Sequence, residues 1–517
     1  MNTLKSTTIC VLFALATGLV ASAQVAATGS QAYSKKTKAQ KYVELVSRND
    51  ILKDSEFAVL AMKVNGDTVA AWNPHTRMLP ASNMKLITTG ATMHALGPDY
   101  KFTTRIACTG EIVEGVLKGD LYIIGGGDPT IASKDSIAIP RFFLFSKWKK
   151  MVEDAGIKKI EGRVVGDGRY FDGMLEKDSW AYHDIGCIDG CGSDGLCYYE
   201  NVQEMTVSAG AKVGDPITYS PKFPSSPWMK FESSARTGKA GTGDNLFFWP
   251  TEYIPYGEIR GSFAIDRKPK TEEFSNKFGA YTCAYYFRDY LISNGIEVSG
   301  KTADVRLGRI REELSVDVQG PYAAKVDDMK ILGSTASATL KEIARHTNLK
   351  SDNFYAETFL RTLGRTKHHS ACYDSSYVAL KEVLDDLGVP QDQVQIRDGS
   401  GLSRHDYLTP QFIVTFLRRM MESPVFPDYI ETIGIAGGPH YVNRLNGESQ
   451  AIRERIHLKS GSMNGVRCYS GYIEPVQGTK NDVIIFSLMT NNALVSASKV
   501  DPILDKIMAA LAAENIQ

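Results

Sequence analysis

Cysteine and net charge are both scarce in this chain of 517 residues. It has 8 cysteines, which is too few for a disulfide scaffold. Its 59 Lys and Arg residues balance 59 Asp and Glu residues, so no net charge attracts a polyanion. These two absences exclude a small disulfide-stapled fold and argue against a nucleic-acid partner. At about 100–200 residues per domain, the length favours several domains.

Long hydrophobic runs are also missing after the N-terminus. No later stretch reaches the roughly 18 apolar residues of a membrane-spanning helix. Lys5, an apolar run over 9–20 and Ala21-Ser22-Ala23 together predict a signal peptide over 1–23. Cys10 lies inside the apolar run rather than after it, which argues against a lipoprotein anchor. We therefore expect a mature chain that is secreted across the inner membrane to the periplasm or cell envelope, with no stable membrane anchor.

Several catalytic motifs are absent. There is no G-x-S-x-G elbow, which disfavours an α/β-hydrolase. The glycine run at 125–127 lacks the G-K-[ST] ending of a phosphate loop, so a turn after a strand is expected there. No acidic pair has a spacing that singles out a glycosidase dyad. We expect no cofactor.

Three cysteines cluster in a loop rich in glycine and aspartate. Cys187, Cys191 and Cys197 follow His183, but the two-residue spacing of a zinc site is missing and no second ligand pair follows. We therefore expect no metal. A local disulfide in an oxidising compartment and free thiols both remain open.

The pattern of elements predicts an α+β fold. Strand-like runs at 57–64 and 68–72 are joined at Asn65-Gly66, a strong hairpin signal, and a helix is predicted between Pro80 and Gly97. Further helices are predicted at 336–347, 354–363, 377–387, 409–422 and 503–513, and late strands at 458–462, 469–474 and 483–489. Helix-rich ends that enclose a strand-rich middle predict an α+β domain interrupted by an insertion.

Ser82-Asn83-Met84-Lys85 stands at the predicted start of the first of these helices. Positions i and i+3 share a helix face, so the Lys85 amine can reach the Ser82 hydroxyl and activate it as a nucleophile. The helix N-terminus favours negative charge that develops on an attacked carbonyl. By itself this S-x-x-K pattern also fits a capping serine followed by a surface lysine.

Two further motifs favour the catalytic interpretation. Ser351-Asp352-Asn353 precedes an amphipathic helix, and Lys459-Ser460-Gly461-Ser462 lies on a predicted strand. Either could be a helix cap or a strand-edge turn in isolation. Their order after S-x-x-K matches the S-x-x-K, S-x-N and K-[ST]-G signatures of penicillin-recognising serine enzymes.

With these motifs the chain resembles the class C low-molecular-mass penicillin-binding proteins, the D-alanyl-D-alanine carboxypeptidases/endopeptidases. Asp398-Gly399-Ser400-Gly401-Leu402-Ser403-Arg404 is similar to that family's D-G-S-G-L-S-R segment. Gly125 to Thr130 and Gly166 to Gly173 resemble blocks of its inserted domains, and Trp180 with Asp184 resembles its W-x-x-x-D block. The resemblance spans nearly the whole predicted mature chain.

The resemblance implies a role for each motif residue. Ser82 would form an acyl-enzyme with the penultimate D-Ala of a peptidoglycan stem peptide, and Lys85 would be the base. Ser351 would relay a proton, Lys459 would keep the site electropositive, and Asn353 would bind a substrate amide and help orient Lys85. The backbone N–H groups of Ser82 and Ser462 would form the oxyanion hole. The residues expected to bind substrate are Ser460, Gly461, Ser462, Asp184, Met463 and Arg404, and β-lactams would act as inhibitors.

Two departures from the family pattern stand out. Ser460 occupies the position that is usually Thr, which keeps the hydroxyl. After Asp184 the family usually has a Tyr-Gly-Ala-like stretch, whereas this chain has the cysteine loop from Cys187 to Cys197. The shape of the substrate pocket is therefore expected to differ near Asp184.

The resemblance also implies an architecture. It predicts a transpeptidase/β-lactamase-like domain, an antiparallel sheet flanked by helices, split by two inserted strand-rich domains. The expected ranges are 24–104 and 338–517 for the catalytic domain, 105–129 and 207–337 for inserted domain II, and 130–206 for inserted domain III.

Two alternative functions remain open. A β-lactamase shares the motif order, but the long insertion between Lys85 and Ser351 and the D-G-S-G-L-S segment argue against it. A non-catalytic peptidoglycan-binding or sensor protein would be expected to lose Ser82 or Lys85, and both are present.

Overall fold

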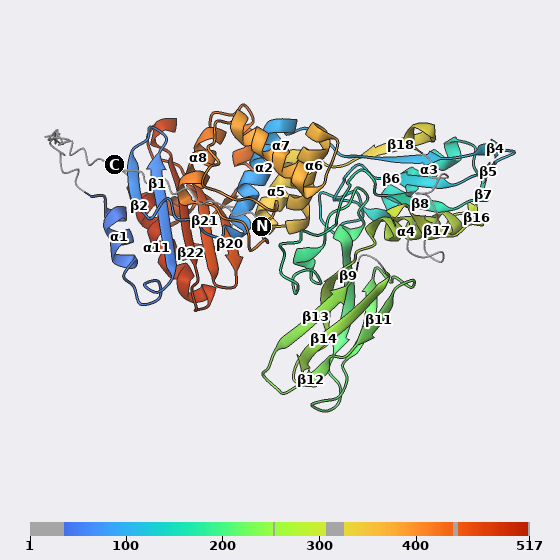
Figure 1. Cartoon of the computed structure of the whole chain (residues 1–517), viewed down its shortest axis with the longest axis horizontal. Helices are drawn as coiled ribbons and strands as arrows, with labels where there is room; N and C mark the ends of the chain where they lie inside the picture. The colour runs from blue at the N-terminus through green and yellow to red at the C-terminus, as the bar shows by residue number, and fades with distance from the viewer. Residues whose placement is uncertain (1–35, 252–253, 307–324, 438–442, 515–517) are drawn as a thin grey trace, which may run out of the picture. The chain divides into compact units, whose positions relative to one another are not determined.

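The computed structural model describes residues 36–251, 254–306, 325–437 and 443–514. The predicted signal peptide at 1–23 lies outside them. Contacts group residues 37–517 into one compact unit, and the account below concerns that unit (Figure 1). Within the described ranges, no helix combines the length and the apolar character that crossing a membrane requires.

A six-stranded antiparallel sheet joins the two ends of the chain. β1 pairs with β22 over its whole length, from Glu56 opposite Asn491 to Lys63 opposite Ile484. The predicted hairpin at Asn65-Gly66 is confirmed, since β1 and β2 pair across it and Gly66 has a φ of 101°. In spatial order the strands are β19 (Gly434–Ile435), β20 (Ile456–Met463), β21 (Val466–Ile473), β22 (Ile484–Asn491), β1 (Glu56–Lys63) and β2 (Thr68–Trp72).

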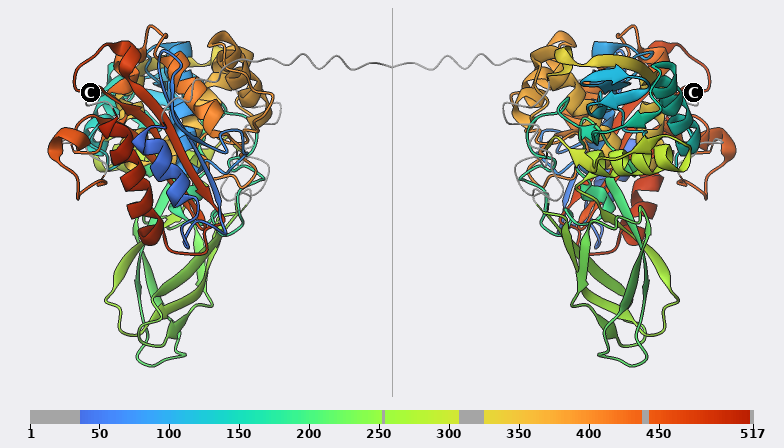
Figure 2. Two further views of the ribbon diagram at one scale, coloured as in Figure 1. Left: turned by 90° about the vertical axis from the view of Figure 1, so that its left-hand side faces the viewer. Right: turned by 90° about the vertical axis from the view of Figure 1, so that its right-hand side faces the viewer.

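Two helices from opposite ends of the chain cover one face of this sheet. α1 (Lys38–Val46) and α11 (Ala497–Ala513) lie side by side over it (Figure 2). Val500, Leu504 and Leu511 are buried along α11 and pack against strand residues such as Leu488. Their helical spacing forms one apolar stripe, which explains why α11 lies flat on the sheet.

The other face carries the helices that position the predicted motifs. α2 (Met84–Leu96) is buried along its first ten residues, so it lies at the centre of this helical layer. The Tyr429 hydroxyl donates to the Leu86 carbonyl at 3.0 Å and ties a neighbouring helix to it. The surrounding helices are α5 (Leu340–Lys350), α6 (Asn353–His368), α7 (Tyr373–Asp386), α8 (Pro410–Met420) and α9 (Phe426–Ile430). The short α10 (Gln450–Arg453) instead contacts α11 on the opposite face.

The start of α5 differs from the sequence prediction. The helix predicted at 336–347 begins at Leu340, because Thr339 and Glu342 form a capping box there. Ala336 is instead the last residue of a strand, β18 (Lys330–Ala336), that pairs with β3 and was not predicted. This pairing joins residues more than two hundred positions apart, which a local pattern does not reveal.

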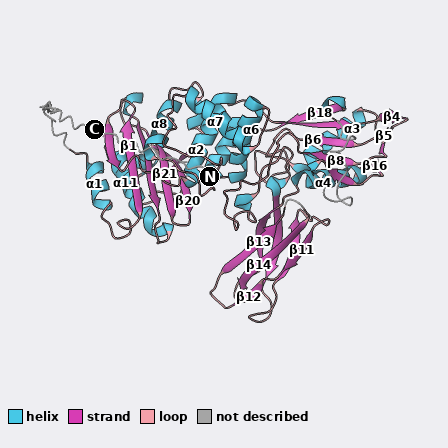
Figure 3. Cartoon of the chain, in the orientation of Figure 1, coloured by secondary structure: helices cyan, strands magenta, loops and turns pink. Residues whose placement is uncertain are grey.

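The middle of the chain is rich in strands, as predicted, with α3 (Arg141–Asp154) and α4 (Gly279–Ser293) beside them (Figure 3). One five-stranded sheet has the order β17-β8-β6-β3-β18 and a second, four-stranded sheet has the order β16-β7-β5-β4. Their bounds are β3 (Thr103–Cys108), β4 (Glu111–Val113), β5 (Val116–Lys118), β6 (Leu121–Ile124), β7 (Lys159–Ile160), β8 (Val164–Asp167), β16 (Glu297–Val298), β17 (Thr302–Asp304) and β18 (Lys330–Ala336).

Two further sheets complete this region. Phe248, Ile259, Phe263 and Phe274 from their strands share one hydrophobic core. The three-stranded sheet contains β10 (Thr218–Phe223), β9 (Val202–Ser208) and β15 (Lys270–Ser275), and the four-stranded sheet contains β11 (Lys230–Ser233), β14 (Tyr256–Ala264), β12 (Arg236–Gly238) and β13 (Asp244–Pro250). β8 pairs with β6 and β17, so one sheet draws strands from both predicted inserted ranges, and the domain boundaries stay a prediction.

Candidate active site

Ser82 and Lys85 meet at the start of α2, as their spacing predicts. Ser82 lies in a 3-10 turn, η1 (Ala81–Asn83), that leads directly into the helix. The Lys85 Nζ atom donates to the Ser82 Oγ atom at 2.9 Å. Ser82 is half-buried and Lys85 is fully buried, so a nucleophile candidate is open to ligands while its partner amine is shielded from water.

Lys85 has two further partners from distant parts of the chain. Its Nζ atom donates to Asn353 Oδ1 at 2.6 Å and to the Ser400 carbonyl at 2.9 Å. Burial lowers the pKa of Lys85 to about 8, although the charge of Asp398 opposes this shift. At pH 7 roughly a tenth of the amine is therefore neutral, which is the form that a general base requires.

The Ser351-Asp352-Asn353 motif forms the turn between α5 and α6. Ser351 ends α5 with a left-handed backbone at φ 61°, and the Asp352 side chain caps α6 by accepting from the Tyr355 N–H. This turn places the Ser351 hydroxyl 2.8 Å from Lys459 Nζ. The second motif therefore contacts both the first motif, through Asn353, and the third motif, through Ser351.

The Lys459-Ser460-Gly461 motif lies on β20, next to η1. Lys459 is buried, and its pKa is lowered well below the ordinary lysine value by burial and then by the charge of Lys85. The Asn83 side chain donates to the Lys459 carbonyl at 3.2 Å and ties the strand to η1. A Cβ atom at Gly461 would lie 2.7 Å from the Pro80 carbonyl oxygen, so the close approach of strand and helix requires glycine.

The Asp398–Arg404 segment lies beside Lys85 and contributes the Ser400 carbonyl that accepts from it. The Glu357 carboxylate, buried on α6, accepts from the backbone N–H groups of Gly399 and Ser400 at 3.0 and 2.8 Å. This contact fixes the Ser400 carbonyl that holds Lys85. Trp180 donates to Asp398 at 2.8 Å. Sequence reasoning identified the segment but missed both Glu357 and the role of the Ser400 carbonyl.

A cleft of about 450 Å³ opens above these contacts. Most of the predicted site residues line this cleft. The exceptions are Lys85, Lys459 and Gly461, which lie next to the cleft but do not line it. Its lining comprises Ser82, His183, Asp184, Asp189, Lys350, Ser351, Asn353, Gly401, Leu402, Arg404, Ser460, Ser462, Met463 and Asn464.

Asp184 and the loop after it form one wall of this cleft. Burial raises the pKa of Asp184, whose carboxylate contacts His183 Nε2 at 3.1 Å. Arg404 lies in the same wall and donates to the Asn464 carbonyl at 3.4 Å. Sequence reasoning missed Asp189, whose backbone carbonyl accepts from Asn353 Nδ2 at 3.2 Å.

The cysteine loop carries no disulfide. Cys187, Cys191 and Cys197 are free thiols, and the local bridge considered from the sequence is not formed. Cys191 and Cys197 are buried, and burial raises the pKa of each thiol well above its ordinary value. Buried thiols of this kind are poor nucleophiles, so Cys191 and Cys197 serve here as small buried residues.

Comparison with known proteins places the chain in a family. A model of the D-Ala-D-Ala carboxypeptidase 3 (S13) family matches residues 39–514. The D-alanyl-D-alanine carboxypeptidase of Actinomadura sp. strain R39 is 26% identical over 452 residues, which cover 84% of this chain and 77% of that protein. The D-alanyl-D-alanine carboxypeptidase DacB of Haemophilus influenzae is 24% identical over 435 residues, which cover 82% and 84%.

A solved structure shares the fold. The crystal structure of penicillin binding protein 4 from Haemophilus influenzae superimposes with a TM-score of 0.75 at 22% sequence identity, covering 91% of this chain and 98% of that one. The α+β architecture and the family resemblance expected from the motifs are thereby confirmed. Because the family model spans nearly the whole described chain, the protein belongs to the D-Ala-D-Ala carboxypeptidase 3 (S13) family of serine-type D-Ala-D-Ala carboxypeptidases.

Proposed function

We propose that this enzyme cleaves D-Ala-D-Ala stem peptides of peptidoglycan through an acyl-enzyme on Ser82, and that it also cleaves peptide cross-bridges. The observation that carries the proposal is the buried Lys85 amine, 2.9 Å from the Ser82 hydroxyl. The amine removes the hydroxyl proton as Ser82 Oγ attacks the carbonyl carbon of the penultimate D-Ala. Asn353 and the Ser400 carbonyl hold Nζ in line for this transfer.

The second and third motifs serve the leaving group. Collapse of the tetrahedral intermediate breaks the peptide bond, and the departing D-Ala amine needs a proton. Ser351 Oγ is the candidate relay, because Lys459 Nζ lies 2.8 Å from it. Lys459 Nζ also donates to the Ser460 carbonyl at 2.7 Å. The terminal carboxylate of the substrate would bind beside it through the hydroxyls of Ser460 and Ser462, and its negative charge would favour the protonated form of Lys459.

Charge on the attacked carbonyl is stabilised by the backbone. We assign the oxyanion hole to the N–H groups of Ser82 and Ser462, at the helix start and on the facing strand. Fixed donors of this kind contribute roughly 3–4 kcal/mol each in acyl-transfer enzymes. Asn353 binds a substrate amide with the side chain that also holds Lys85.

The wall formed by Asp184, Arg404 and Met463 would contact the third residue of the stem. A carboxylate beside an open cleft suits a stem residue with a distal amino group. Water then attacks the acyl-enzyme carbonyl, which releases the shortened peptide and restores Ser82.

A β-lactam carries a strained amide and a nearby carboxylate, so it would acylate Ser82 in the same way. Penicillin binding protein 4 from Haemophilus influenzae has been crystallised with a β-lactam, and it shares this fold. We further propose that the enzyme acts in the periplasm or cell envelope, where peptidoglycan is found. The predicted signal peptide supports that location.

Labelled penicillin tests the proposal. The wild-type enzyme should form a stable covalent adduct, Ser82→Ala should form none, and the exposed control Ser498→Ala should label like wild type. D-Ala release from a D-Ala-D-Ala peptide should follow the same pattern. No adduct on the wild type would refute the main proposal. Rapid β-lactam turnover would favour a β-lactamase, and an adduct without D-Ala release would favour a sensor.

A further inference from the structure

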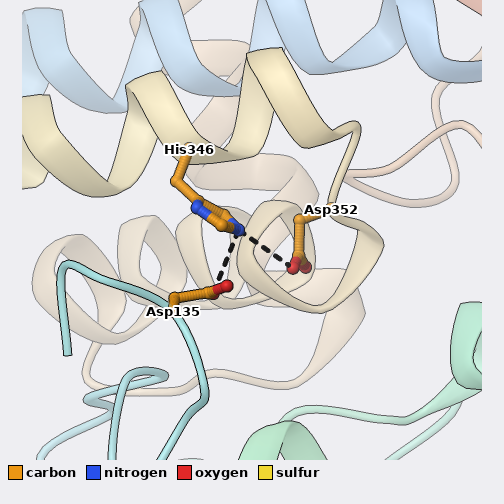
Figure 4. A group of neighbouring side chains, drawn as sticks. All are labelled: Asp135, His346 and Asp352. Carbon is orange, nitrogen blue, oxygen red and sulfur yellow. Dashed lines mark ion pairs between the residues drawn. The ribbon is translucent and has the colours of Figure 1, made fainter. Parts of the chain in front are cut away.

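A second polar cluster lies behind the S-x-N turn and outside the cleft. Asp135 comes from the loop before α3, His346 from α5 and Asp352 from the cap of α6. The His346 ring points between the two carboxylates, with Nε2 3.0 Å from Asp135 Oδ2 and 3.9 Å from Asp352 Oδ2 (Figure 4). One donor atom from each residue lies within 4.8 Å of the other two, and all three residues are half-buried.

These separations fit a metal ion. A tetrahedral ion with bonds of about 2.0–2.2 Å holds its ligand atoms roughly 3.3–3.6 Å apart. The distances from His346 Nε2 are 3.0 Å to Asp135 Oδ2 and 3.9 Å to Asp352 Oδ2, one just below that range and one just above it. One imidazole and two carboxylates without a thiol suit Zn²⁺ and related divalent transition metals.

Tyr355 orients both carboxylates. Its hydroxyl donates to Asp135 Oδ2 at 2.8 Å, and its backbone N–H donates to Asp352 Oδ1 at 2.9 Å. Hydrogen bonds of this kind to the ligands are typical of metal sites in proteins, where they fix the direction of the donor atoms. The two carboxylates are therefore held in place before any ion binds.

A third carboxyl group lies next to the cluster. Glu200 is buried there and accepts from the Ser133 hydroxyl at 2.6 Å. Burial, and then the charge of Asp352, raise the pKa of Glu200 to about 8, so this group is mostly protonated at neutral pH. The negative charge that a divalent cation would neutralise is therefore that of the two carboxylates, Asp135 and Asp352.

We propose that Asp135, His346 and Asp352 form a binding site for a divalent transition-metal ion, with Zn²⁺ as the probe ion. The site is separate from the peptidase chemistry and goes beyond it. His346 and Asp352 flank Ser351, whose left-handed backbone forms the catalytic turn. An ion that binds both residues would hold this turn from behind and would link it to the inserted loop through Asp135.

Metal titration of the full chain tests the site. Chelator-stripped enzyme is titrated with Zn²⁺ by calorimetry and with Co²⁺ by visible absorption. The wild type should bind one equivalent. His346→Gln and Asp135→Asn should each weaken that binding by at least about tenfold, since even the loss of a supporting contact costs 10–100-fold. The two substituted residues lie on different segments of the chain. If one variant fails to fold, the other still tests the site.

His94→Gln is the matched control. The His94 ring also contacts a carboxylate, Asp386, at 3.0 Å, but its other nitrogen contacts the Ser423 hydroxyl. This variant should bind Zn²⁺ like the wild type. The proposal fails if the wild type binds no ion more tightly than His346→Gln, or if His94→Gln loses the same affinity. Labelling of Ser82 by penicillin would persist in either case, so failure of the metal site is distinguishable from failure of the peptidase proposal.

Discussion

At the scale of single residues, Lys85 controls the pH dependence of acylation. Only its neutral amine accepts the Ser82 proton, and burial lowers its pKa from 10.5 to about 8. The acylation rate should therefore rise by nearly tenfold per pH unit below pH 8 and level off above it. Stopped-flow labelling with penicillin between pH 6 and pH 10 measures this profile.

Lys85→Ala should slow acylation by about 10²–10⁴-fold, the usual contribution of a general base. The surface variant Lys53→Ala should label like the wild type, since the exposed Lys53 amine pairs with the exposed Asp50 carboxylate at 3.0 Å. A rate that is flat from pH 6 to pH 10, or full activity in Lys85→Ala, would contradict the assignment of the base.

Gly401 packs directly against the nucleophile turn. Its φ is 83°, and a Cβ atom there would lie 1.9 Å from the Ala81 carbonyl oxygen. Gly401→Ala should lower the free energy of unfolding by about 1–3 kcal/mol through this overlap, in addition to the cost of the left-handed backbone. It should also slow acylation, because Ala81 precedes Ser82.

Gly97→Ala is the control that separates the cost of the left-handed backbone from the cost of the overlap with Ala81. Gly97 has the same φ of 83°, but a Cβ atom there meets no atom within 4 Å. Thermal unfolding of Gly97→Ala should therefore report the backbone cost alone, with normal penicillin labelling. Equal losses in the two variants would show that the contact with Ala81 is unimportant.

At the scale of elements, α6 is fastened to the inserted segments through Arg361. This arginine is fully buried and donates to the carbonyls of Asp172, Ser193 and Ala371. Arg361→Met would leave those carbonyls without their donor and should cost roughly 3 kcal/mol or more of unfolding free energy. Urea denaturation measures the loss.

Arg365→Met is the control on the same helix. Arg365 is one turn further along, only half-buried, and donates to the His369 carbonyl. Its loss should cost no more than about 1 kcal/mol. If Arg365→Met proved as destabilising as Arg361→Met, the buried contacts to the inserted segments would not be the cause.

Helices and strands were predictable where the residues that specify them lie close together in the sequence. The β1–β2 hairpin follows from Asn65-Gly66, and the helix predicted at 503–513 is the later part of α11, which begins at Ala497. β18 was missed, because its partner β3 is distant in sequence and residues 330–336 have no pattern that specifies a strand.

At the scale of the whole molecule, buried carboxyl groups determine how stability changes with pH. Burial raises the pKa of Asp304 to about 7 and that of Asp128 to about 6, from 3.8. Between about pH 4 and pH 7 the folded state therefore binds protons that the unfolded state has lost. The stability from these groups is fully present below pH 3.8 and is lost as the pH rises through 6 and 7, by up to about 1.4 kcal/mol per group and pH unit.

Urea denaturation at pH 5, 6, 7 and 8 tests this sign. Asp304→Asn keeps the oxygen that accepts from the Arg306 N–H at 2.7 Å but removes the titrating proton, so the decline should become shallower. The exposed control Asp50→Asn should keep the wild-type slope. Stability that rises from pH 5 to pH 8 would contradict the prediction.

The sequence by itself determined the three motifs, the contact of Lys85 with Ser82 and the α+β class, because these depend on local helix geometry and on residue identity. The resemblance implied that Asn353 orients Lys85, but only the tertiary structure decided the geometry of that contact and the other groups around Lys85. Its bonds to Asn353 and to the Ser400 carbonyl join residues 268 and 315 positions apart. Chain folding over such distances is set by packing of the whole core, which no local pattern encodes. The same reason hid Glu357 beneath the site, Asp189 beside it and the cluster of Asp135, His346 and Asp352 behind it.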